Sequence, residues 1–223
     1  MLPRHFTLFH AAFTVACLIV LPLPGAAIGI KLLALTLLYH VCFPWIAYRK
    51  QDIMWRQLWQ FYLPFGIFNI FPDWFLSAHL QTLYYPDTEG VFKIGTIGGY
   101  MPFLWFIPMF VVTYIALMAE KKYGQPAALL HLMGIGLVIF GASEHGFKLL
   151  GSWHAQNVHF LIGNAAVYVL LAEAVLLLSA FYLFKLIAPH SAGVKALAAF
   201  WLMLLYMGSL VFFYFLVEVL MRG

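Results

Sequence analysis

The chain has 223 residues, of which 65% are hydrophobic, 18% aromatic and only 9% charged, and its mean hydropathy is +0.93. Soluble domains carry about 45–50% apolar and about 25% charged residues, so this composition excludes a water-soluble fold, a disordered chain and a nucleic-acid-binding domain. The formal net charge of +4 comes from Lys and Arg residues scattered between apolar segments, as membrane topology signals are. We therefore expect an all-α, polytopic integral membrane protein.

Long apolar segments separated by Pro, Gly and charged residues predict a single domain of seven transmembrane helices over residues 1–223. The predicted helices cover residues 6–23, 26–48, 54–80, 100–119, 126–143, 158–186 and 194–220. The first segment also has the layout of a secretory signal, with a basic residue, an apolar run and a small-residue end. Cleavage there is the alternative, but the run from Phe6 to Leu23 is long for a signal core and favours a retained helix.

The basic residues predict the orientation of the bundle. With seven spans, the N-terminus and the even-numbered turns share one face, which carries twice as many Lys and Arg residues as the other face. The face with the N-terminus carries Arg4, Arg49, Lys50, Arg56, Lys121, Lys122, Lys185 and Lys195. The opposite face carries Lys31, Lys93, Lys148 and Arg222. The positive-inside rule then places the N-terminus in the cytoplasm and the C-terminus outside, in what we expect to be a bacterial inner membrane.

Acidic residues inside apolar segments are the first candidates for chemistry. Glu173 lies well inside the sixth predicted helix, where a carboxylate is costly unless it is protonated or paired. A neutral buried acid is suited to general acid catalysis. The alternative is a structural role, in which Glu173 forms a hydrogen bond to a neighbouring helix. Asp73 lies between aromatic residues in FPDWFLS, which suits an acid catalyst or a carbocation pocket, and equally a helix cap or the partner of an Arg or Lys. Glu144 with Lys148, and Glu218 with Arg222, have the spacing of helical ion pairs, so a structural role competes with a catalytic one.

Two helix–loop–helix units resemble each other within the chain. In each unit an acidic residue lies near the end of the first helix and an Ile-Gly pair opens the second. This register aligns Trp105 with Glu173. Related halves with a site at their interface are common in membrane folds.

Histidines suggest two further sites. The outer face holds a potential set of metal ligands: His79, Glu144, His145, His154 and His159. No pair among these histidines has the i,i+3 or i,i+4 spacing of ligands on one helix, so a metal site would need the loop to bring them together. His40 and His131 lie at equal depth on different helices, where they would be axial haem ligands or ordinary buried histidines.

The segment 70–120 resembles the membrane-integral lycopene cyclases. In that family an aromatic–Asp turn is followed by a helix with a Pro and paired glutamates. FPDW supplies Asp73 and Trp74 here, and Pro102 opens PFLW, while Leu104 and Trp105 stand where the glutamates would be. The resemblance implies an isoprenoid or other lipophilic substrate.

The leading hypothesis is a membrane enzyme that cyclises or isomerises a lipophilic, isoprenoid-like molecule by acid–base chemistry, with the bilayer and that small molecule as its partners and no cofactor. Glu173 or Asp73 would donate the proton, and Glu144 or His145 would remove one. Four aromatic residues are expected to line the pocket: Trp74, Tyr100, Trp105 and Trp153. The alternatives are a metal-dependent lipid hydrolase or oxidase that uses the outer histidines, and a transporter, sensor or assembly factor without catalysis.

Overall fold

A computed structural model describes residues 2–221 of the chain, so Arg222, the predicted partner of Glu218, lies outside the described residues. Its regular elements, in chain order, are α1 (Arg4–Val20), α2 (Ile28–Arg49), α3 (Ile53–Phe68), α4 (Ile70–Trp74), the π-helical turn η1 (Phe75–His79), β1 (Leu83–Tyr84), the 3₁₀ turn η2 (Asp87–Glu89), β2 (Lys93–Ile94), β3 (Ile97–Gly98), α5 (Met101–Leu104), α6 (Phe106–Tyr123), α7 (Gln125–Leu149), β4 (His154–Ala155), α8 (Val167–Ile187), α9 (Ala192–Tyr214) and the π-helical turn η3 (Phe215–Leu220).

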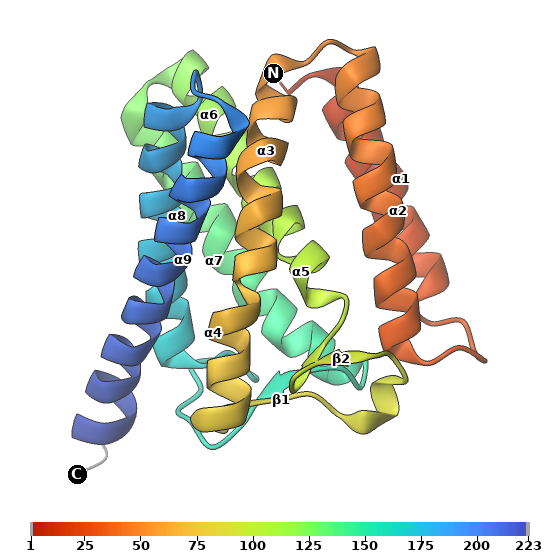
Figure 1. Cartoon of the computed structure of the whole chain (residues 1–223), viewed down its shortest axis with the longest axis vertical. Coiled ribbons are helices and arrows are strands. Elements are labelled where there is room, and N and C mark those ends of the chain that lie inside the picture. The colour runs from red at the N-terminus through yellow and green to blue at the C-terminus, as the bar shows by residue number, and fades with distance from the viewer. Residues whose placement is uncertain (1, 222–223) are drawn as a thin grey trace.

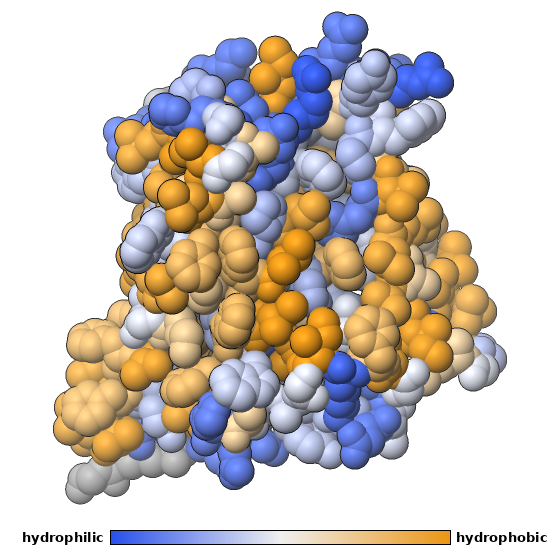
Figure 2. All heavy atoms as spheres, in the orientation of Figure 1, coloured by the Kyte–Doolittle hydropathy of each residue, from blue (hydrophilic) through white to orange (hydrophobic). Residues whose placement is uncertain are grey.

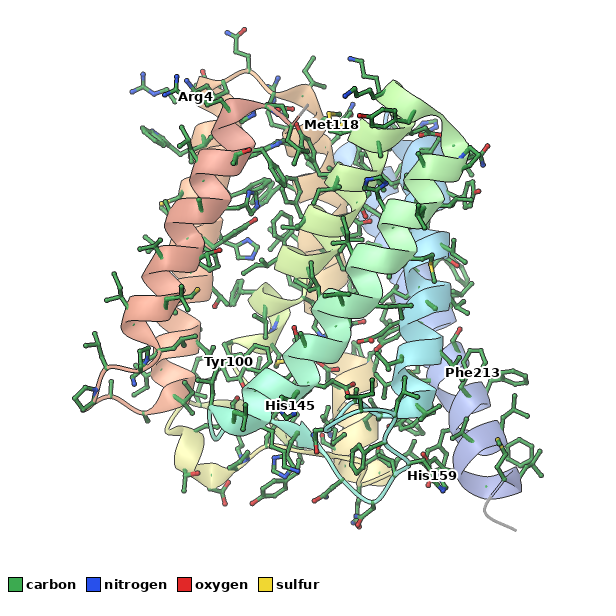
Figure 3. The ribbon with its side chains drawn as sticks, turned by 180° about the vertical axis from the view of Figure 1, so that it is seen from behind. Arg4, Tyr100, Met118, His145, His159 and Phe213 are labelled. Atoms are coloured by element: carbon green, nitrogen blue, oxygen red, sulfur yellow. The ribbon has the colours of Figure 1, made fainter. Side chains whose placement is uncertain are left out.

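The fold is an upright bundle of helices with its short strands gathered at one end (Figure 1). Arg4 and Met118 lie toward one end of the bundle, and Tyr100, His145 and His159 lie toward the other (Figure 3). Apolar side chains form a broad band between two more polar ends (Figure 2). Five helical stretches of residues 2–221 are long and apolar enough to cross a membrane: α2, α5–α6, α7, α8 and α9–η3. The chain is therefore an all-α protein with the construction of a membrane protein.

Two predicted helix boundaries differ from the structure, on either side of one loop. The helix predicted to end at residue 143 continues as α7 to Leu149, and the helix predicted from residue 158 begins only at Val167. Residues 159–166 instead fold back on themselves, since His159 O accepts from Val167 N and Leu161 N donates to Ala165 O. The loop predicted to begin at residue 144 is thus helical as far as Leu149, and Glu144 is buried within α7.

The first helix is fixed to the bundle through its N-terminal half. Phe6 is the buried residue of α1, and its ring stacks on Tyr114 of α6 with the ring centroids 4.8 Å apart. The neighbouring rings of Phe43 and Trp55 stack at 4.6 Å. Asp52 caps α3 by accepting from Trp55 N, and it also accepts from His5 Nε2 at 3.1 Å. The first turns of α1 are thus joined to α3 and α6, while the second half of α1 has no fully buried residue.

The helix α3 approaches α5 closely at a glycine. A Cβ atom on Gly66 would lie 2.3 Å from the backbone oxygen of Pro102. This approach holds α5, and with it Trp105, beside the α3–α4 segment that carries Asp73. Close packing at small residues is typical of helix contacts in membranes.

We predict that Gly66→Ala destabilises the fold, because a methyl group here meets backbone that has to move. Overpacking of this kind costs about 1–3 kcal/mol, so the thermal midpoint of the detergent-solubilised protein should fall. Gly134→Ala is the matched control, since a Cβ there has no neighbour within 4 Å. Equal midpoints for the two variants would contradict the role assigned to Gly66.

Candidate functional site

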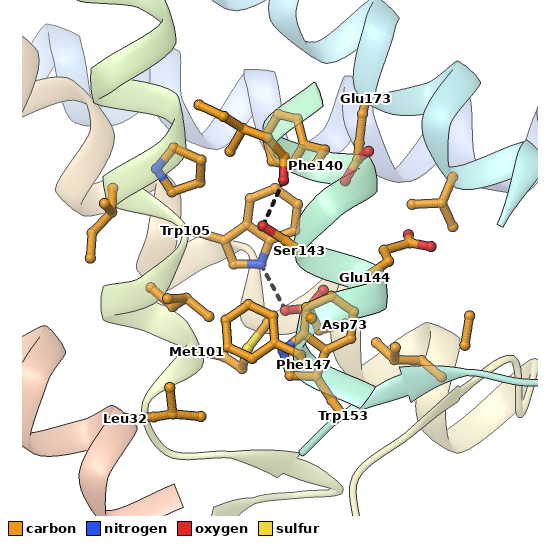
Figure 4. Close-up of a pocket in the computed structure, with 18 of the residues that line it drawn as sticks. Leu32, Asp73, Met101, Trp105, Phe140, Ser143, Glu144, Phe147, Trp153 and Glu173 are labelled. Atoms are coloured by element: carbon orange, nitrogen blue, oxygen red, sulfur yellow. Dashed lines mark hydrogen bonds between the residues drawn. The ribbon is translucent and has the colours of Figure 1, made fainter. Parts of the chain in front are cut away.

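A cavity of about 350 Å³ lies inside the bundle (Figure 4). Its lining comes from α1, α2, α4, η1 and α5–α9. Its size is within the range of about 300–1,000 Å³ that is typical of small-molecule sites. The walls are mainly aliphatic and aromatic. The aromatic residues that line it are Phe13, Tyr85, Trp105, Phe140, Phe147, Trp153, Tyr168 and Tyr206.

Asp73 enters the cavity from the short helix α4, where the long third helix changes direction. Asn69 separates α3 from α4, and Pro72 removes one N–H from the helical ladder. The carboxyl group of Asp73 is 3% exposed, and its Oδ2 accepts a hydrogen bond of 2.9 Å from Trp105 Nε1. One indole donor therefore orients this acid and partly satisfies it.

Two glutamates reach the same cavity from the opposite side. Glu144 of α7 is 4% exposed, and its Oε2 accepts a hydrogen bond of 2.7 Å from the backbone N–H of Ala166, just before α8. Glu173 of α8 is equally buried, and its Oε2 has no hydrogen-bond partner among the described residues. The charges of Glu144 and Asp73 both act on Glu173. The three acids are therefore electrostatically linked around one apolar space.

The internal similarity of the sequence has a counterpart in this arrangement. In one unit Trp105 bonds to Asp73, and in the other Glu173 interacts with Glu144. All four residues line the cavity. Both helix–loop–helix units thus contribute side chains to one cavity.

A small cap closes the cavity at the end of the bundle that carries the loops. Strands β1 and β4 pair antiparallel, with Leu83 opposite Ala155, and both of these residues line the cavity. Thr82, just before β1, forms a hydrogen bond of 2.7 Å with the Tyr168 hydroxyl. The cap joins loop segments that are far apart in the sequence and covers the cavity.

A buried carboxylate holds the cap together. Oε1 of Glu89 accepts hydrogen bonds from the hydroxyl groups of Tyr100 (2.6 Å) and Ser152. Burial raises the pKa of Tyr100, and the charge of Glu89 raises it further, so the phenol remains a donor at neutral pH. Burial likewise raises the pKa of Tyr85, with Asp73 as a further cause, and this neutral phenol lines the cavity.

The structure brings together only some of the residues that the sequence predicted for the pocket. Trp105 and Trp153 line the cavity, as do the three acids. Trp74 instead lies 39% exposed, against Gly95 and the His79 ring. Tyr100 is in the cap, and His145 lines a separate groove between α7 and α8, next to Gly163.

The proposed metal ligands lie apart from one another. His79 packs on the rings of Trp74 and Phe75, His154 packs on Tyr84, and His159 forms an ion pair of 2.9 Å with Glu218. Within residues 2–221, no group of three or more His, Cys, Asp and Glu side chains is placed to hold a metal ion.

The two histidines considered as haem ligands make local hydrogen bonds. Nε2 of His40 bonds to the Phe103 carbonyl at 2.9 Å, and Nδ1 of His131 bonds to the Ala127 carbonyl at 2.7 Å. Neither histidine lines the cavity that holds the acids.

Several residues of the site were not identified from the sequence. Tyr85, Tyr168 and Tyr206 line the cavity, and Glu89 is the buried acid of the cap. A Tyr in an apolar helix looks the same in the sequence whether it faces lipid or a cavity. The neighbours of Glu89 in the sequence, Asp87, Thr88 and Gly90, are those of an ordinary loop and gave no signal of burial.

A family model described as a domain of unknown function (DUF6989) matches residues 70–217, and the chain belongs to this family. The match covers both similar units and all three acids of the cavity. No curated protein and no solved structure matches the chain.

We predict that Tyr100→Phe destabilises the cap, because it leaves the buried Glu89 carboxylate with one donor fewer. The expected loss is about 1–3 kcal/mol, measured as a lower thermal midpoint and as faster proteolysis of residues 80–100. Tyr84→Phe, at a half-exposed position in the same cap, is the control and should change neither quantity. A stable Tyr100→Phe variant would show that the Glu89 cluster does not support the cap.

Proposed function

We propose that this member of the DUF6989 family is a membrane enzyme that cyclises or isomerises a lipophilic, isoprenoid-like substrate by proton transfer. One observation carries the proposal: three carboxyl groups, Asp73, Glu144 and Glu173, face a single aromatic-lined cavity within the apolar part of the bundle. Ionisable groups are expensive inside a membrane and are generally functional there. The isoprenoid character of the substrate rests on the resemblance of residues 70–120 to lycopene cyclases.

The surroundings of each acid suggest its role. Glu173 has an oxygen without a donor, which favours the neutral acid in an apolar space and makes it the proton donor. Glu144 receives the Ala166 N–H, which stabilises the carboxylate and makes it the base. His145 lies in the other groove, which favours Glu144 for this role. Asp73 with Trp105, and the aromatic walls, would stabilise positive charge in the substrate.

The proposed reaction is balanced without a cofactor. The Glu173 proton adds to a substrate C=C bond and leaves a carbocation, which a second C=C bond attacks when a ring forms. The Glu144 carboxylate then removes a proton from the carbon next to the cation, and a new C=C bond results. Between turnovers Glu144 releases its proton to solvent and Glu173 takes one up, which restores both groups and carries solvent hydrogen into the next substrate molecule.

The proposal also includes the membrane topology of the chain. We place seven spans in a bacterial inner membrane, with α1 and the α3–α4–η1 segment added to the five long apolar stretches. The N-terminus would be cytoplasmic, because Lys121, Lys122 and Lys185 end helices on the face where α1 begins.

We predict that the protein incorporates solvent deuterium into an isoprenoid substrate. Vesicles with the purified protein in D₂O would be incubated with linear and cyclic polyenes and prenyl alcohols, and the extracted lipids analysed by mass spectrometry. Glu173→Gln should lower incorporation by about 10²–10⁴-fold, as expected for loss of a general acid. Glu144→Gln should act similarly, because no base remains to remove the second proton.

Glu120→Gln is the matched carboxyl-to-amide control, since Glu120 pairs with Lys185 near the end of the bundle and does not line the cavity. It should keep full incorporation. Incorporation that survives Glu173→Gln would contradict the assignment of the acid. Proton-coupled movement of a solute across the vesicle without deuterium in any lipid would favour a transporter over an enzyme.

We also predict the orientation from single cysteines in a background without Cys17 and Cys42. A membrane-impermeant maleimide added to intact spheroplasts should label Thr88→Cys, in the loop end of the bundle, and leave Lys122→Cys unlabelled until the cells are lysed. Both positions are exposed. The reverse pattern would place the N-terminus outside.

A further inference from the structure

The lining residues are fully buried at one end of the cavity, the deep end, and partly exposed at the other, the shallow end. At the deep end, Tyr206, Glu173 and Asp73 are each at most 4% exposed. At the shallow end the lining residues are partly exposed and mostly apolar. They come from α1, α6 and α7, and include Phe13, Cys17, Ile107, Val111, Ser143 and Phe147. The cavity therefore opens sideways, between α1 and the pair α6–α7.

This opening follows from how α1 is attached. The aromatic cluster around Phe6 and the His5–Asp52 bond fix its first half, whereas Cys17 and Leu21 near its other end face the cavity. The helices α6 and α7 beside the opening are long and apolar enough to cross a membrane, so in the proposed topology the medium next to the opening is lipid.

By contrast, the end of the cavity toward the loops is largely covered, with Leu150 at its edge 37% exposed. The β1–β4 ladder covers the cavity, and Thr82, Tyr85 and Ala155 in and beside it are at most 5% exposed. The Glu89 cluster fixes the next layer of the cap. A ligand from the aqueous side would have to displace these hydrogen bonds, whereas a ligand from the bilayer passes only apolar side chains.

The charges of the lining restrict the ligand further. Three carboxyl groups line the cavity, and no Lys, Arg or His residue within residues 2–221 does so. A phosphate or carboxylate group would meet no cation there and would be repelled by any ionised acid. Phosphate-bearing lipids therefore do not suit this site.

We propose that the cavity takes an uncharged lipid directly from the bilayer through the opening between α1 and α6–α7. The ligand is an uncharged polyene or prenyl alcohol rather than a phospholipid or a prenyl diphosphate. Its far end reaches the acids while its tail remains near Cys17. That this ligand is the substrate rests on the proposed function; the route and the charge selectivity do not.

Photo-crosslinking in phosphatidylcholine vesicles tests both parts. The probe is geranylgeraniol with a diazirine on its chain, and labelled peptides are mapped by mass spectrometry. Label should appear in residues 13–21 and 139–147 and should be displaced by unlabelled geranylgeraniol. Geranylgeranyl diphosphate has the same chain with an anionic group. Displacing the label with it should require a concentration at least tenfold higher than with geranylgeraniol. Equal competition by the diphosphate would overturn the charge selectivity.

Large side chains at the opening test the route. Cys17→Trp and Val111→Trp, from opposite sides, should each lower labelling of the cavity at least fivefold, while Cys17→Ala keeps it. Cys42→Trp is the matched control, at a partly exposed position outside the lining, and should leave labelling unchanged. Unchanged labelling in both Trp variants that elute as folded protein, or label confined to the groove beside His145, would overturn the route.

The test separates this inference from the proposed function because Glu173→Gln should still bind the probe. Displaceable label at the opening without deuterium incorporation would refute the enzyme and support the route. Deuterium incorporation together with labelling that is unchanged in Cys17→Trp and Val111→Trp would support the enzyme and refute the route.

Discussion

Carboxyl groups in an apolar interior need donors from the protein itself, because lipid offers none. In this bundle Asp73 obtains the indole N–H of Trp105, Glu144 obtains the backbone N–H of Ala166, and Glu173 leaves one oxygen without a partner. Much of the fold supports these contacts. The break at Asn69 turns Asp73 into the cavity, the glycine contact between α3 and α5 brings Trp105 beside it, and the late start of α8 places Ala166 against Glu144.

The cap limits the entry of water into the cavity, and the proposed side opening admits a lipophilic ligand. A carbocation formed there would react with water if water entered freely, and closing a site to water protects such intermediates. The β1–β4 ladder and the Glu89 cluster provide that closure toward the aqueous side. In the proposed route, the ligand enters from lipid beside the second half of α1, which has no fully buried residue and is held to α2 at its end by Lys31. In this proposal, one architecture separates the ligand's route from the solvent.

The predictions from the sequence succeeded where a single residue carries the signal. Acids inside apolar helices stand out because burying them is costly, and all three line the cavity with Trp105 and Trp153. Predictions that depended on which way a side chain points, or on how a loop folds, were less accurate. Trp74 follows Asp73 directly, but successive residues on a helix point about 100° apart, so it faces outward. The histidines of the outer face are close in sequence, yet α7 continues through His145 to Leu149 and the hairpin at 159–166 carries His159 toward Glu218.

The sequence by itself determined the class of the protein, the number and approximate extent of its helical stretches, and the positions of acids inside apolar segments, since each follows from local hydropathy and the cost of burying charge. The tertiary structure decided which of those acids share a space, that a loop carboxylate closes one end of it, and that the other side opens between α1 and α6–α7. These features depend on the rotation and tilt of helices against one another. Helix faces that are apolar all round, as those of a membrane bundle are, leave no periodic pattern from which such angles can be read.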